Sequence, residues 1–394
     1  MTDVYRESLA LHKKYQGKIK IESVIPINNR KDLAVVYTPG VAEPCRKIAA
    51  NPALSYDLTW RGRTVAVISD GSAVLGLGNI GPEAAIPVME GKAILLKKFG
   101  GVDAVPIVVN TQNSAEIVSF VRQIAPSFAG INLEDISAPR CFQIEEELQN
   151  IGIPVFHDDQ HGTAIVVKAA LVNAAKVVGK PYESLNVVII GAGAAGLAVA
   201  KMLLGISCLA NVCQKIPRHP AVGSLIMVDR KGAIYAGRTD QNVYKQAIAG
   251  VSNLKKRQGA IGKTIKGADV VIGLSAPNLI TGAMVRSMAK NPIVFSLANP
   301  TPEIMPDVAK KAGAAVVASG RSDFANQINN VLVFPGIFQA VIKGRLTTIT
   351  QEMKLAASEA LSNLVKKPSP AAIIPDPFTP HLADYVARAV LADK

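Results

Sequence analysis

The stretch that decides the fold is NVVIIGAGAAG, residues 186–196. Its first five residues form an apolar run of the kind seen in strands that are buried on both faces of a parallel sheet. The glycines that follow have the spacing GxGxxG, and the residues after them predict a helix through about Leu204. A buried strand, this glycine turn and a helix together form the dinucleotide-binding fingerprint in its expected context. An ordinary strand–turn–helix built from small residues is the alternative interpretation.

The residues of the turn have separate tasks in that fingerprint. Gly191 allows a tight turn, Gly193 lets a pyrophosphate approach the backbone, and Gly196 lets the helix pack closely on the strand. Ala194 and Ala195 open the predicted helix, whose free N–H groups and positive dipole end favour phosphates. These five residues are therefore predicted to bind the cofactor.

Asp229 is the predicted partner of the adenosine ribose. It follows the apolar run at 224–228, where the fingerprint normally places an acidic residue. It lies 38 residues beyond Gly191 rather than about 20, so we expect an insertion within residues 205–223. Asp229 favours NAD, whereas the adjacent Arg230 and Lys231 could accept the 2′-phosphate of NADP, and the choice stays open.

Short apolar strands alternate with helices along most of the chain, which indicates an α/β protein with largely parallel sheets. Strands are predicted at residues 64–69, 104–109, 186–190, 224–228, 270–273, 293–296 and 314–318. We expect an N-terminal α/β domain over residues 1–160, which would carry the chemistry, and a Rossmann-like, doubly wound NAD(P)-binding domain over 161–345. A C-terminal helical segment over 346–394 is expected to pack back on the body.

The amino-acid composition limits the classes of protein to which this chain can belong. Of the 394 residues 49% are hydrophobic and 19% charged, so the chain is globular rather than disordered. A formal net charge of +13 would suit a nucleic acid, an anionic membrane surface or small anionic ligands, or would simply be solvated. Aromatic residues are only 5%, the lysines are scattered and no recognition motif is present, so no nucleic-acid partner is expected.

The sequence also gives an expectation about the compartment. The N-terminal segment has no apolar stretch of signal-peptide length, and no uninterrupted apolar run of eighteen residues occurs, so no membrane span is expected. The four cysteines are few and widely spaced, which predicts reduced thiols. Cys208 and Cys213 could form half of a zinc site, but no second pair has ligand spacing. We therefore predict a soluble, cytoplasmic protein.

Two acidic pairs, Glu134-Asp135 and Asp158-Asp159, follow apolar stretches that are typical of strands. Parallel α/β sheets bind ligands beyond the carboxyl ends of their strands. Adjacent side chains in a strand point to opposite faces, but at a strand-to-loop turn they can converge. Three such carboxylates would leave positions for water and substrate, as expected for Mg²⁺ or Mn²⁺. The alternative interpretation makes Asp158 a helix cap and leaves Glu134 in a surface loop.

His157 and His161 flank the second acidic pair. A hard-cation site with enough carboxylates has little need of imidazole ligands. Supporting or structural roles are therefore expected for both histidines.

Several longer motifs resemble those of the short, bacterial-type malic enzymes, and together they extend over nearly the whole chain. They are VYTPGVA at 36–42, DGSAVLGLGNIGPEAAIPVMEGKAILLKKFGGVDAVPI at 70–107, NLEDISAP at 132–139, FHDDQHGTA at 156–164, GAGAAG at 191–196, GLSAPNLIT at 273–281, FSLANPTPEI at 295–304 and GRSDFANQINNVLVFPGIF at 320–338. The resemblance implies oxidative decarboxylation of malate to pyruvate and carbon dioxide, with NAD or NADP and with Mg²⁺ or Mn²⁺. It also implies a homodimer or higher homo-oligomer.

The resemblance further implies roles for individual residues. Glu134, Asp135 and Asp159 would hold the metal ion. Lys92, in MEGKA, would be the general base for the malate hydroxyl, and Tyr37, in YTPG, the general acid that protonates the enol. From the local pattern alone, Lys92 would be one more helix lysine and Tyr37 an aromatic residue before a turn.

Other assignments come from the same motifs. Asp158 would support Lys92 or the metal ligands, Asn299 would bind the cofactor or the substrate, and Asn330 would bind the substrate. The longer members of the family carry an arginine after the equivalent of Asp70-Gly71, where this chain has Ser72, so another group must hold that substrate carboxylate.

Two other functions stay open. A different two-domain NAD(P)-dependent dehydrogenase would explain the glycine turn, but not the acidic pairs together with the TPG and NNV motifs. A non-catalytic dinucleotide-binding or nucleic-acid-binding module would predict basic and aromatic residues gathered on one face.

Overall fold

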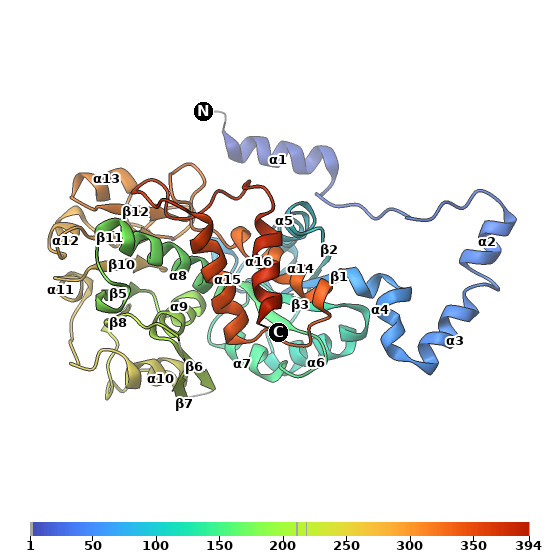
Figure 1. Cartoon of the computed structure of the whole chain (residues 1–394), viewed down its shortest axis with the longest axis horizontal. Coiled ribbons are helices and arrows are strands. Elements are labelled where there is room, and N and C mark those ends of the chain that lie inside the picture. Colours follow the sequence, from blue (N-terminus) through green and yellow to red (C-terminus); the bar gives the residue numbers. More distant parts are fainter. Residues whose placement is uncertain (1–2, 210–211, 218, 394) are drawn as a thin grey trace.

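Two sheets organise the molecule. The computed structural model describes residues 3–209, 212–217 and 219–393. A four-stranded and a six-stranded sheet lie along the long axis of the molecule, each with its own helices (Figure 1). The predicted α/β class with largely parallel sheets is confirmed.

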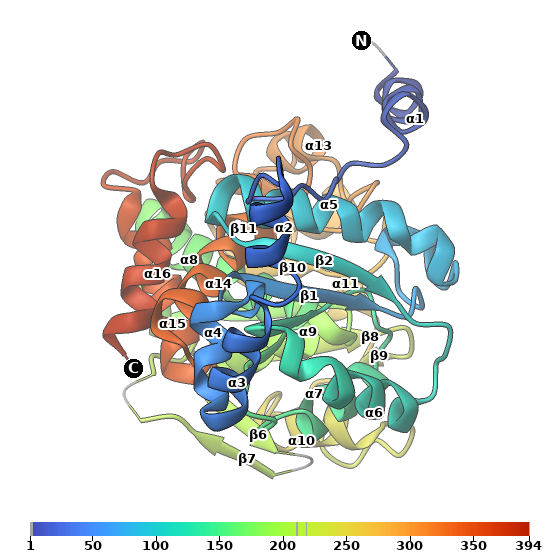
Figure 2. The same ribbon diagram turned by 90° about the vertical axis from the view of Figure 1, so that its right-hand side faces the viewer.

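The first sheet has four parallel strands. They are β1 (Thr64–Ser69), β2 (Asp103–Val108), β3 (Gly130–Leu133) and β4 (Val155–His157), in the order β2-β1-β3-β4. Its helices are α5 (Pro82–Gly100), α6 (Ser114–Ile124) and α7 (Arg140–Glu147). Helix α5 lies on one side of the strands, and α6 and α7 lie on the other (Figure 2). Every residue of β1 is buried, as its continuous apolar run predicts.

The second sheet is Rossmann-like. Its strands are β5 (Asn186–Ile190), β8 (Ser224–Asp229), β9 (Gly232–Ala233), β10 (Val270–Gly273), β11 (Ile293–Ser296) and β12 (Val316–Ser319), in the order β12-β11-β10-β5-β8-β9. Its helices are α9 (Ala194–Leu204), α10 (Val243–Val251), α11 (Ile261–Thr264), α12 (Gly282–Arg286) and α13 (Pro306–Lys311). Only the edge strand β9 pairs antiparallel. The fingerprint strand β5 is central, between β8 and β10.

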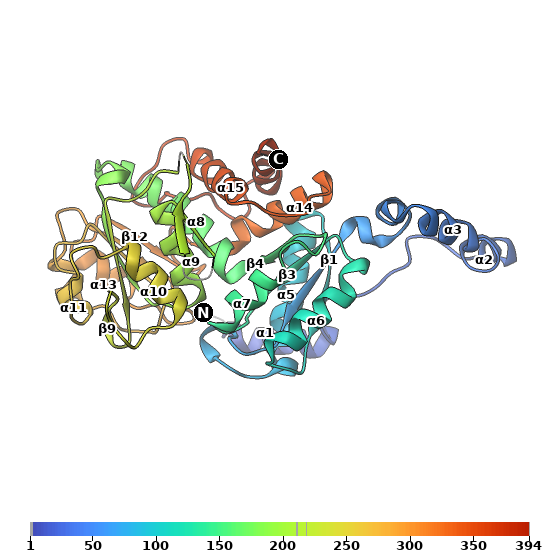
Figure 3. The same cartoon turned by 90° about the horizontal axis from the view of Figure 1, so that it is seen from below.

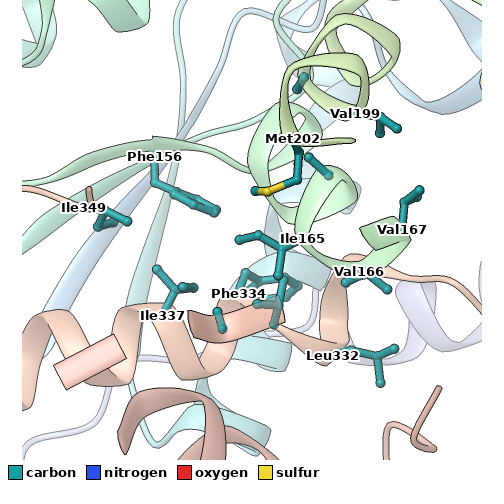
Figure 4. Close-up of a cluster of buried hydrophobic side chains, with 14 of the residues drawn as sticks. Phe156, Ile165, Val166, Val167, Val199, Met202, Leu332, Phe334, Ile337 and Ile349 are labelled. Atoms are coloured by element: carbon teal, nitrogen blue, oxygen red, sulfur yellow. The ribbon is translucent and has the colours of Figure 1, made fainter. Parts of the chain in front are cut away.

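Four helices form the region between the sheets. They are α8 (Asp158–Val178), α14 (Phe334–Gly344), α15 (Gln351–Leu364) and α16 (Leu382–Ala392). Helix α8 packs against α9 and α15, while α14 packs against α5 and α16. Figure 4 shows apolar side chains of α8 and α14 meeting those of β4 and α9 in one buried cluster, which includes Phe156, Ile165, Met202 and Phe334. The domain boundaries at residues 160 and 345 stay predictions.

Helix α8 is long and apolar enough to cross a membrane by length and composition alone. However, 67% of its most apolar window is buried inside the protein, as in the core helix of a soluble protein.

The N-terminal segment extends away from the body. It contains α1 (Val4–Tyr15), α2 (Arg30–Val36), α3 (Ala42–Ala50), η1 (Pro52–Leu54), α4 (Ser55–Leu58) and η2 (Trp60–Arg63). We call residues 19–58 the arm. Figures 1 and 3 show α2 and α3 projecting from the end of the molecule that holds the four-stranded sheet. None of the helices α1 to α4 has a buried residue.

The predicted insertion contains a short hairpin that corrects the cysteine prediction. Strands β6 (Ile206–Leu209) and β7 (Val212–Lys215) pair antiparallel and place Cys208 directly opposite Cys213. The two form a disulfide, so the prediction of reduced thiols is wrong for this pair. The sequence spacing says nothing about the hairpin register that brings the two sulfurs together. Cys45 and Cys141 are free, and residues 210, 211 and 218 of the insertion lie outside the described residues.

Candidate active site

Three carboxylates meet beyond the ends of β3 and β4. Glu134 and Asp135 directly follow β3, and Asp159 lies in the first turn of α8, which starts where β4 ends. One carboxylate oxygen of each residue lies within 4.8 Å of the other two. Because β3 and β4 are parallel neighbours, their carboxyl ends share one edge of the sheet. Such an all-oxygen donor set fits a hard divalent cation such as Mg²⁺ or Mn²⁺.

The backbone at Asp135 explains how two adjacent carboxylates reach one place. Asp135 has a φ of 54°, in the left-handed region, so the extended chain turns directly after Glu134. The Asp135 N–H donates a hydrogen bond to Asp159 Oδ2 at 2.8 Å. Asn132 Nδ2 donates to Glu134 Oε2 at 2.8 Å. The convergence predicted for a strand-to-loop turn is therefore present and is held by hydrogen bonds.

Lys92 reaches the acidic cluster from α5. Its Nζ lies 2.8 Å from Glu134 Oε1 and 2.6 Å from Asp158 Oδ2, and 4.2 Å from the ring centroid of Phe334. Burial alone would lower the pKa of Lys92, but the carboxylates of Asp158 and Glu134 outweigh burial and raise it. Burial raises the pKa of Glu134 well above its usual range; Lys92 opposes this and the neighbouring aspartates add to it. The cluster therefore carries an excess of carboxylates, which a bound cation would balance.

Residues far apart in the sequence hold Asp158 beside Lys92. Asn330 Nδ2 donates to Asp158 Oδ2 at 3.0 Å, and Thr163 Oγ1 donates to Asn330 Oδ1 at 3.1 Å. A Cβ at Gly162 would lie 2.0 Å from Asp158 Oδ1, so this position leaves no room for a side chain. Gly162, Thr163 and Asn132 carry no prediction from the sequence. Their positions within the NLEDISAP and FHDDQHGTA motifs are the only signal that could have identified them.

A second buried polar group lies next to the cluster. Glu145 on α7 accepts hydrogen bonds from the His157 N–H at 3.1 Å and from Gln160 Nε2 at 3.0 Å, and His161 Nε2 lies 2.8 Å from Glu145 Oε1. Lys354 Nζ lies 3.2 Å from His161 Nδ1. Burial would raise the pKa of Glu145, but His161 and Lys354 outweigh it and lower the pKa to about 2. His161 is thus held between Glu145 and Lys354, in a supporting position.

The glycine turn lies between β5 and α9, which begins at Ala194 and Ala195. Gly191 has a φ of 114°, and a Cβ there would lie 2.3 Å from a carbonyl oxygen just beyond β10. A Cβ at Gly196 would lie 2.1 Å from the Gly191 carbonyl oxygen. By contrast, a Cβ at Gly193 would have no atom of the described residues within 4 Å, and it borders a cleft of about 510 Å³. The turn therefore fits a pyrophosphate at Gly193, next to the N-terminus of α9.

Asp229 lines the same cleft together with Arg230, Lys231 and Lys245. Its Oδ1 accepts hydrogen bonds from the Lys231 N–H and from Arg238 Nη1, both at 3.0 Å. Its Oδ2 accepts from Arg238 Nη2 at 2.6 Å and from Lys245 Nζ at 2.8 Å. Burial would raise the pKa of Asp229, but the bonds from Arg238 and Lys245 lower it below its ordinary range. The carboxylate is thus already engaged by four donors.

Two predicted site residues lie elsewhere. Tyr37 directly follows α2 on the arm and is 66% exposed, and α2 lies far from α5 (Figures 1 and 3). Asn299 is exposed beyond the end of β11, where a Cβ at Gly76 would lie 2.2 Å from its carbonyl oxygen. It therefore lies where a loop of the first domain touches the second. The structure brings together Lys92, Glu134, Asp135, Asp158, Asp159 and Asn330.

The chain is similar to known proteins in both sequence and structure. Residues 160–390 match the family model described as malic enzyme, NAD binding domain, and residues 16–117 match malic enzyme, N-terminal domain. The chain is 52% identical over 388 residues to the bifunctional malic/malolactic enzyme of Bacillus subtilis, covering 98% of this chain and 91% of that protein. It is 44% identical over 410 residues to the NADP-dependent malic enzyme of Halomonas elongata, covering 99% and 93%. The crystal structure of the NAD-dependent malic enzyme of Thermotoga maritima is 43% identical, with a TM-score of 0.91 and 98% of each chain covered.

Proposed function

The chain belongs to the malic enzyme family, and on that premise we propose that its reaction takes place at the acidic cluster around Lys92. The resemblance seen in the sequence is confirmed. The chain is an NAD(P)-dependent oxidoreductase that decarboxylates malate oxidatively. Beyond this reaction, we propose a bound metal ion and a role for each side chain of the site.

We infer that Glu134, Asp135 and Asp159 hold Mg²⁺ or Mn²⁺. The convergence of three oxygen donors and the excess of carboxylates over Lys92 support this assignment. When bound, the ion supplies positive charge that polarises the substrate oxygens and offsets the carboxylates that raise the pKa of Lys92.

Lys92 is the proposed general base, and its contact with Glu134 is the single observation that carries the proposal. Glu134 belongs to the three-carboxylate cluster, so a substrate hydroxyl bound at the cluster would lie within reach of Lys92 Nζ. Lys92 takes the hydroxyl proton as the hydride on the same carbon moves to the nicotinamide. Asp158, which Asn330 holds in place, positions the amine for that transfer.

The second half of the reaction releases carbon dioxide and leaves an enol. A proton must then reach the carbon that lost the carboxylate, and Tyr37 is the proposed donor. Asn299 and Asn330 remain the proposed contacts to substrate and to the nicotinamide end. NAD(P) would bind at Gly191, Gly193, Ala194, Ala195 and Gly196, with its adenosine toward Asp229.

The cluster also separates this function from the alternatives. A dehydrogenase that only transfers hydride has no need of three carboxylates beside a buried lysine, and a binding module has no need of the lysine. We propose malate and pyruvate as the small-molecule partners, a homo-oligomer in the cytoplasm, and no nucleic-acid or membrane partner.

The test is to follow NADH and NADPH formation from L-malate with and without Mn²⁺, and to assay pyruvate. Mn²⁺-dependent reduction of one cofactor with equimolar pyruvate is expected. Folded protein that reduces neither cofactor would refute the proposal.

A matched pair of variants tests the base. Lys92→Ala should lower turnover by roughly 10²–10⁴-fold while dinucleotide binding is retained. Lys98→Ala, which changes an exposed lysine on the same helix, should leave turnover unchanged. Full turnover by Lys92→Ala would remove Lys92 from this role.

A further inference from the structure

A second cavity lies between helices of the two sheets, away from the acidic cluster. Its volume is about 270 Å³, and it is bounded by α7, the first two turns of α8, the second half of α9, strand β6 and the start of α15. Neither Lys92 nor the three clustered carboxylates line it, and the glycine turn borders a different cleft. Ligand pockets start at roughly 300 Å³, so this cavity fits a molecule of only a few atoms.

Two lysines line this cavity without a carboxylate partner. Lys354 on α15 is buried, and its Nζ lies 3.2 Å from His161 Nδ1. Lys201 on α9 is partly buried, and its Nζ lies 6.0 Å from the ring centroid of Phe142. No carboxylate oxygen of the described residues lies within 4.0 Å of either Nζ. Both ammonium groups are therefore open to an anion in the cavity.

Other largely buried lysines of the chain have oxygen partners. Lys92 lies 2.6 Å from a carboxylate oxygen of Asp158, and Lys180 lies 2.6 Å from one of Asp269. Lys168 donates to a tyrosine hydroxyl at 3.4 Å and to a backbone carbonyl at 3.3 Å. Buried charges in proteins are normally paired, because an unpaired charge is costly to remove from water. The two lysines of the cavity depart from this rule.

The glutamates beside the cavity do not replace such a partner. Glu145 accepts from the His157 N–H and from Gln160 Nε2, and it contacts His161 Nε2. Glu146 accepts from a tyrosine hydroxyl at 3.5 Å. Burial lowers the pKa of both lysines more than these glutamates raise it, and Lys201 lowers the pKa of Lys354 further. The two lysines thus repel each other across a space that an anion would fill.

The remaining lining indicates what kind of anion fits. Apolar side chains of Ala198, Met202 and Ile349 form part of the wall, and the amides of Gln149 and Gln351 lie on its more exposed side. An inorganic oxyanion would pair with the lysines but would leave the apolar wall without contacts. A carboxylate with a short hydrocarbon chain matches both parts, since ligand pockets combine an apolar lining with a few placed polar groups.

The predicted insertion at residues 205–223 contributes to the rim. Ser207 and Cys208 of β6 line the cavity, and the disulfide to Cys213 cross-links the hairpin that carries them. The dinucleotide fingerprint does not require this segment. It therefore has a task of its own, which is to complete a wall of the cavity.

We propose that this cavity binds a small carboxylate anion with a short hydrocarbon chain, and that Lys201 and Lys354 neutralise its charge. The site is distinct from the acidic cluster and does not depend on the reaction proposed there. Lys354 reduces the stability of the empty protein, and the bound anion offsets that cost.

Calorimetric titration of the metal-free protein with succinate tests the proposal. The wild type should bind one succinate per chain, and Lys201→Met and Lys354→Met should each weaken binding roughly tenfold or more, because each removes a charge-assisted contact. Lys310→Met, at an exposed lysine, should bind succinate as the wild type does.

Three results would overturn the proposal. The first is a wild-type protein that does not bind succinate, and the second is wild-type affinity in both cavity variants. The third is inorganic phosphate that binds at least as tightly as succinate, which would exclude a role for the hydrocarbon chain. Lys92→Ala is a further control and should retain succinate binding, since loss there would place the ligand in the acidic cluster instead.

Thermal unfolding supplies a second measurement. A ligand that binds only the folded state raises the melting temperature by mass action. Saturating succinate should therefore raise the Tm of the wild type well above that of the same protein in sodium chloride of equal ionic strength, and should raise the Tm of Lys354→Met much less. Equal shifts in both proteins would show that succinate acts elsewhere. Both measurements use protein without metal, cofactor or malate, so their outcome is independent of the proposed reaction.

Discussion

Replacing Lys354 by methionine should make the protein more stable at neutral pH. Lys354 on α15 is only 6% exposed, and its Nζ lies 3.2 Å from His161 Nδ1. Burial lowers the pKa of Lys354 from 10.5 to about 8; Glu145 opposes this effect and Lys201 adds to it. At neutral pH the folded protein therefore holds a charged group in surroundings that favour the neutral form.

The size of the effect follows from that pKa. Each factor of ten in proton affinity corresponds to about 1.4 kcal/mol, so keeping Lys354 charged costs the native state about 3 kcal/mol. Methionine has a similar shape and no charge, but it removes the contact with His161, which is worth about 1 kcal/mol. The Lys354→Met variant should gain about 2 kcal/mol in free energy of unfolding.

The pH dependence supplies the check. Lys354 loses its proton near pH 8 in the folded chain and near 10.5 in the unfolded chain, so between these values the unfolded state binds more protons. The wild-type free energy of unfolding should therefore rise by about 3 kcal/mol relative to the variant across this window, so the variant's advantage of about 2 kcal/mol should close and then reverse.

Urea unfolding of both proteins at pH 7 and at several values up to pH 10.5 measures this difference. Lys310→Met, at an exposed lysine, is the control and should change stability by less than about 0.5 kcal/mol at every pH. A Lys354→Met variant that is less stable at pH 7, or a difference that does not shrink with pH, would refute the reasoning.

Three further predictions concern the cofactor and metal sites. Gly196→Ala should lower the free energy of unfolding by more than about 2 kcal/mol, because its Cβ would lie 2.1 Å from a carbonyl oxygen. Gly193→Ala should fold normally and lose dinucleotide affinity. Thermal unfolding and cofactor titrations distinguish the two variants, and equal melting temperatures would contradict the prediction. Asp135→Asn should weaken Mn²⁺ binding roughly tenfold or more in calorimetric titrations of the metal alone, and unchanged affinity would exclude it as a ligand. Arg238→Met should remove two of the four donors on the Asp229 carboxylate, make it more available to ribose hydroxyls and lower the NADP-to-NAD ratio of kcat/KM roughly tenfold. An unchanged ratio would show that this ion pair does not affect cofactor choice.

Continuous apolar runs predict the strands of this fold well. Residues 64–69, 186–190, 270–273 and 293–296 are strands with the predicted limits, because strands buried on both faces need unbroken apolar sequence. The convergence of Glu134, Asp135 and Asp159, the proposed metal ligands, was also within reach of sequence reasoning, because acidic pairs beyond parallel strands share one edge of a sheet.

Tertiary contacts decide what the sequence pattern cannot show. Lys92 sits in the same helix as Lys97 and Lys98 and differs from them through its contacts with Asp158 and Glu134, which come from distant segments. Before the structure, only its family motif singled it out. Arg238, which lies nine residues after Asp229 in a loop beyond β9, matches no pattern, although it supplies two of the four donors that engage that carboxylate.

Helix α8 begins at Asp158, although the apolar part of its sequence, which predicts a helix over residues 163–178, starts five residues later. Its acidic first turn suits the positive end of the helix dipole, an effect that hydrophobic periodicity does not detect.

The position of Asp159 at the head of α8 has a mechanical consequence. Glu134 and Asp135 directly follow β3 of the first sheet, whereas Asp159 lies in the first turn of α8, a helix of 21 residues that packs against α9 of the cofactor domain. The three proposed metal ligands thus come from the turn after β3 and from the start of the helix that packs on the cofactor domain. A cation bound there would connect the two domains at a single point. Helix α8, as a rigid element, would transmit a movement at that point to the glycine turn. Any opening or closing of the cofactor cleft would then be a rotation about a point close to the metal ion. The affinity for the metal ion would therefore be coupled to the distance between the hydride donor and acceptor.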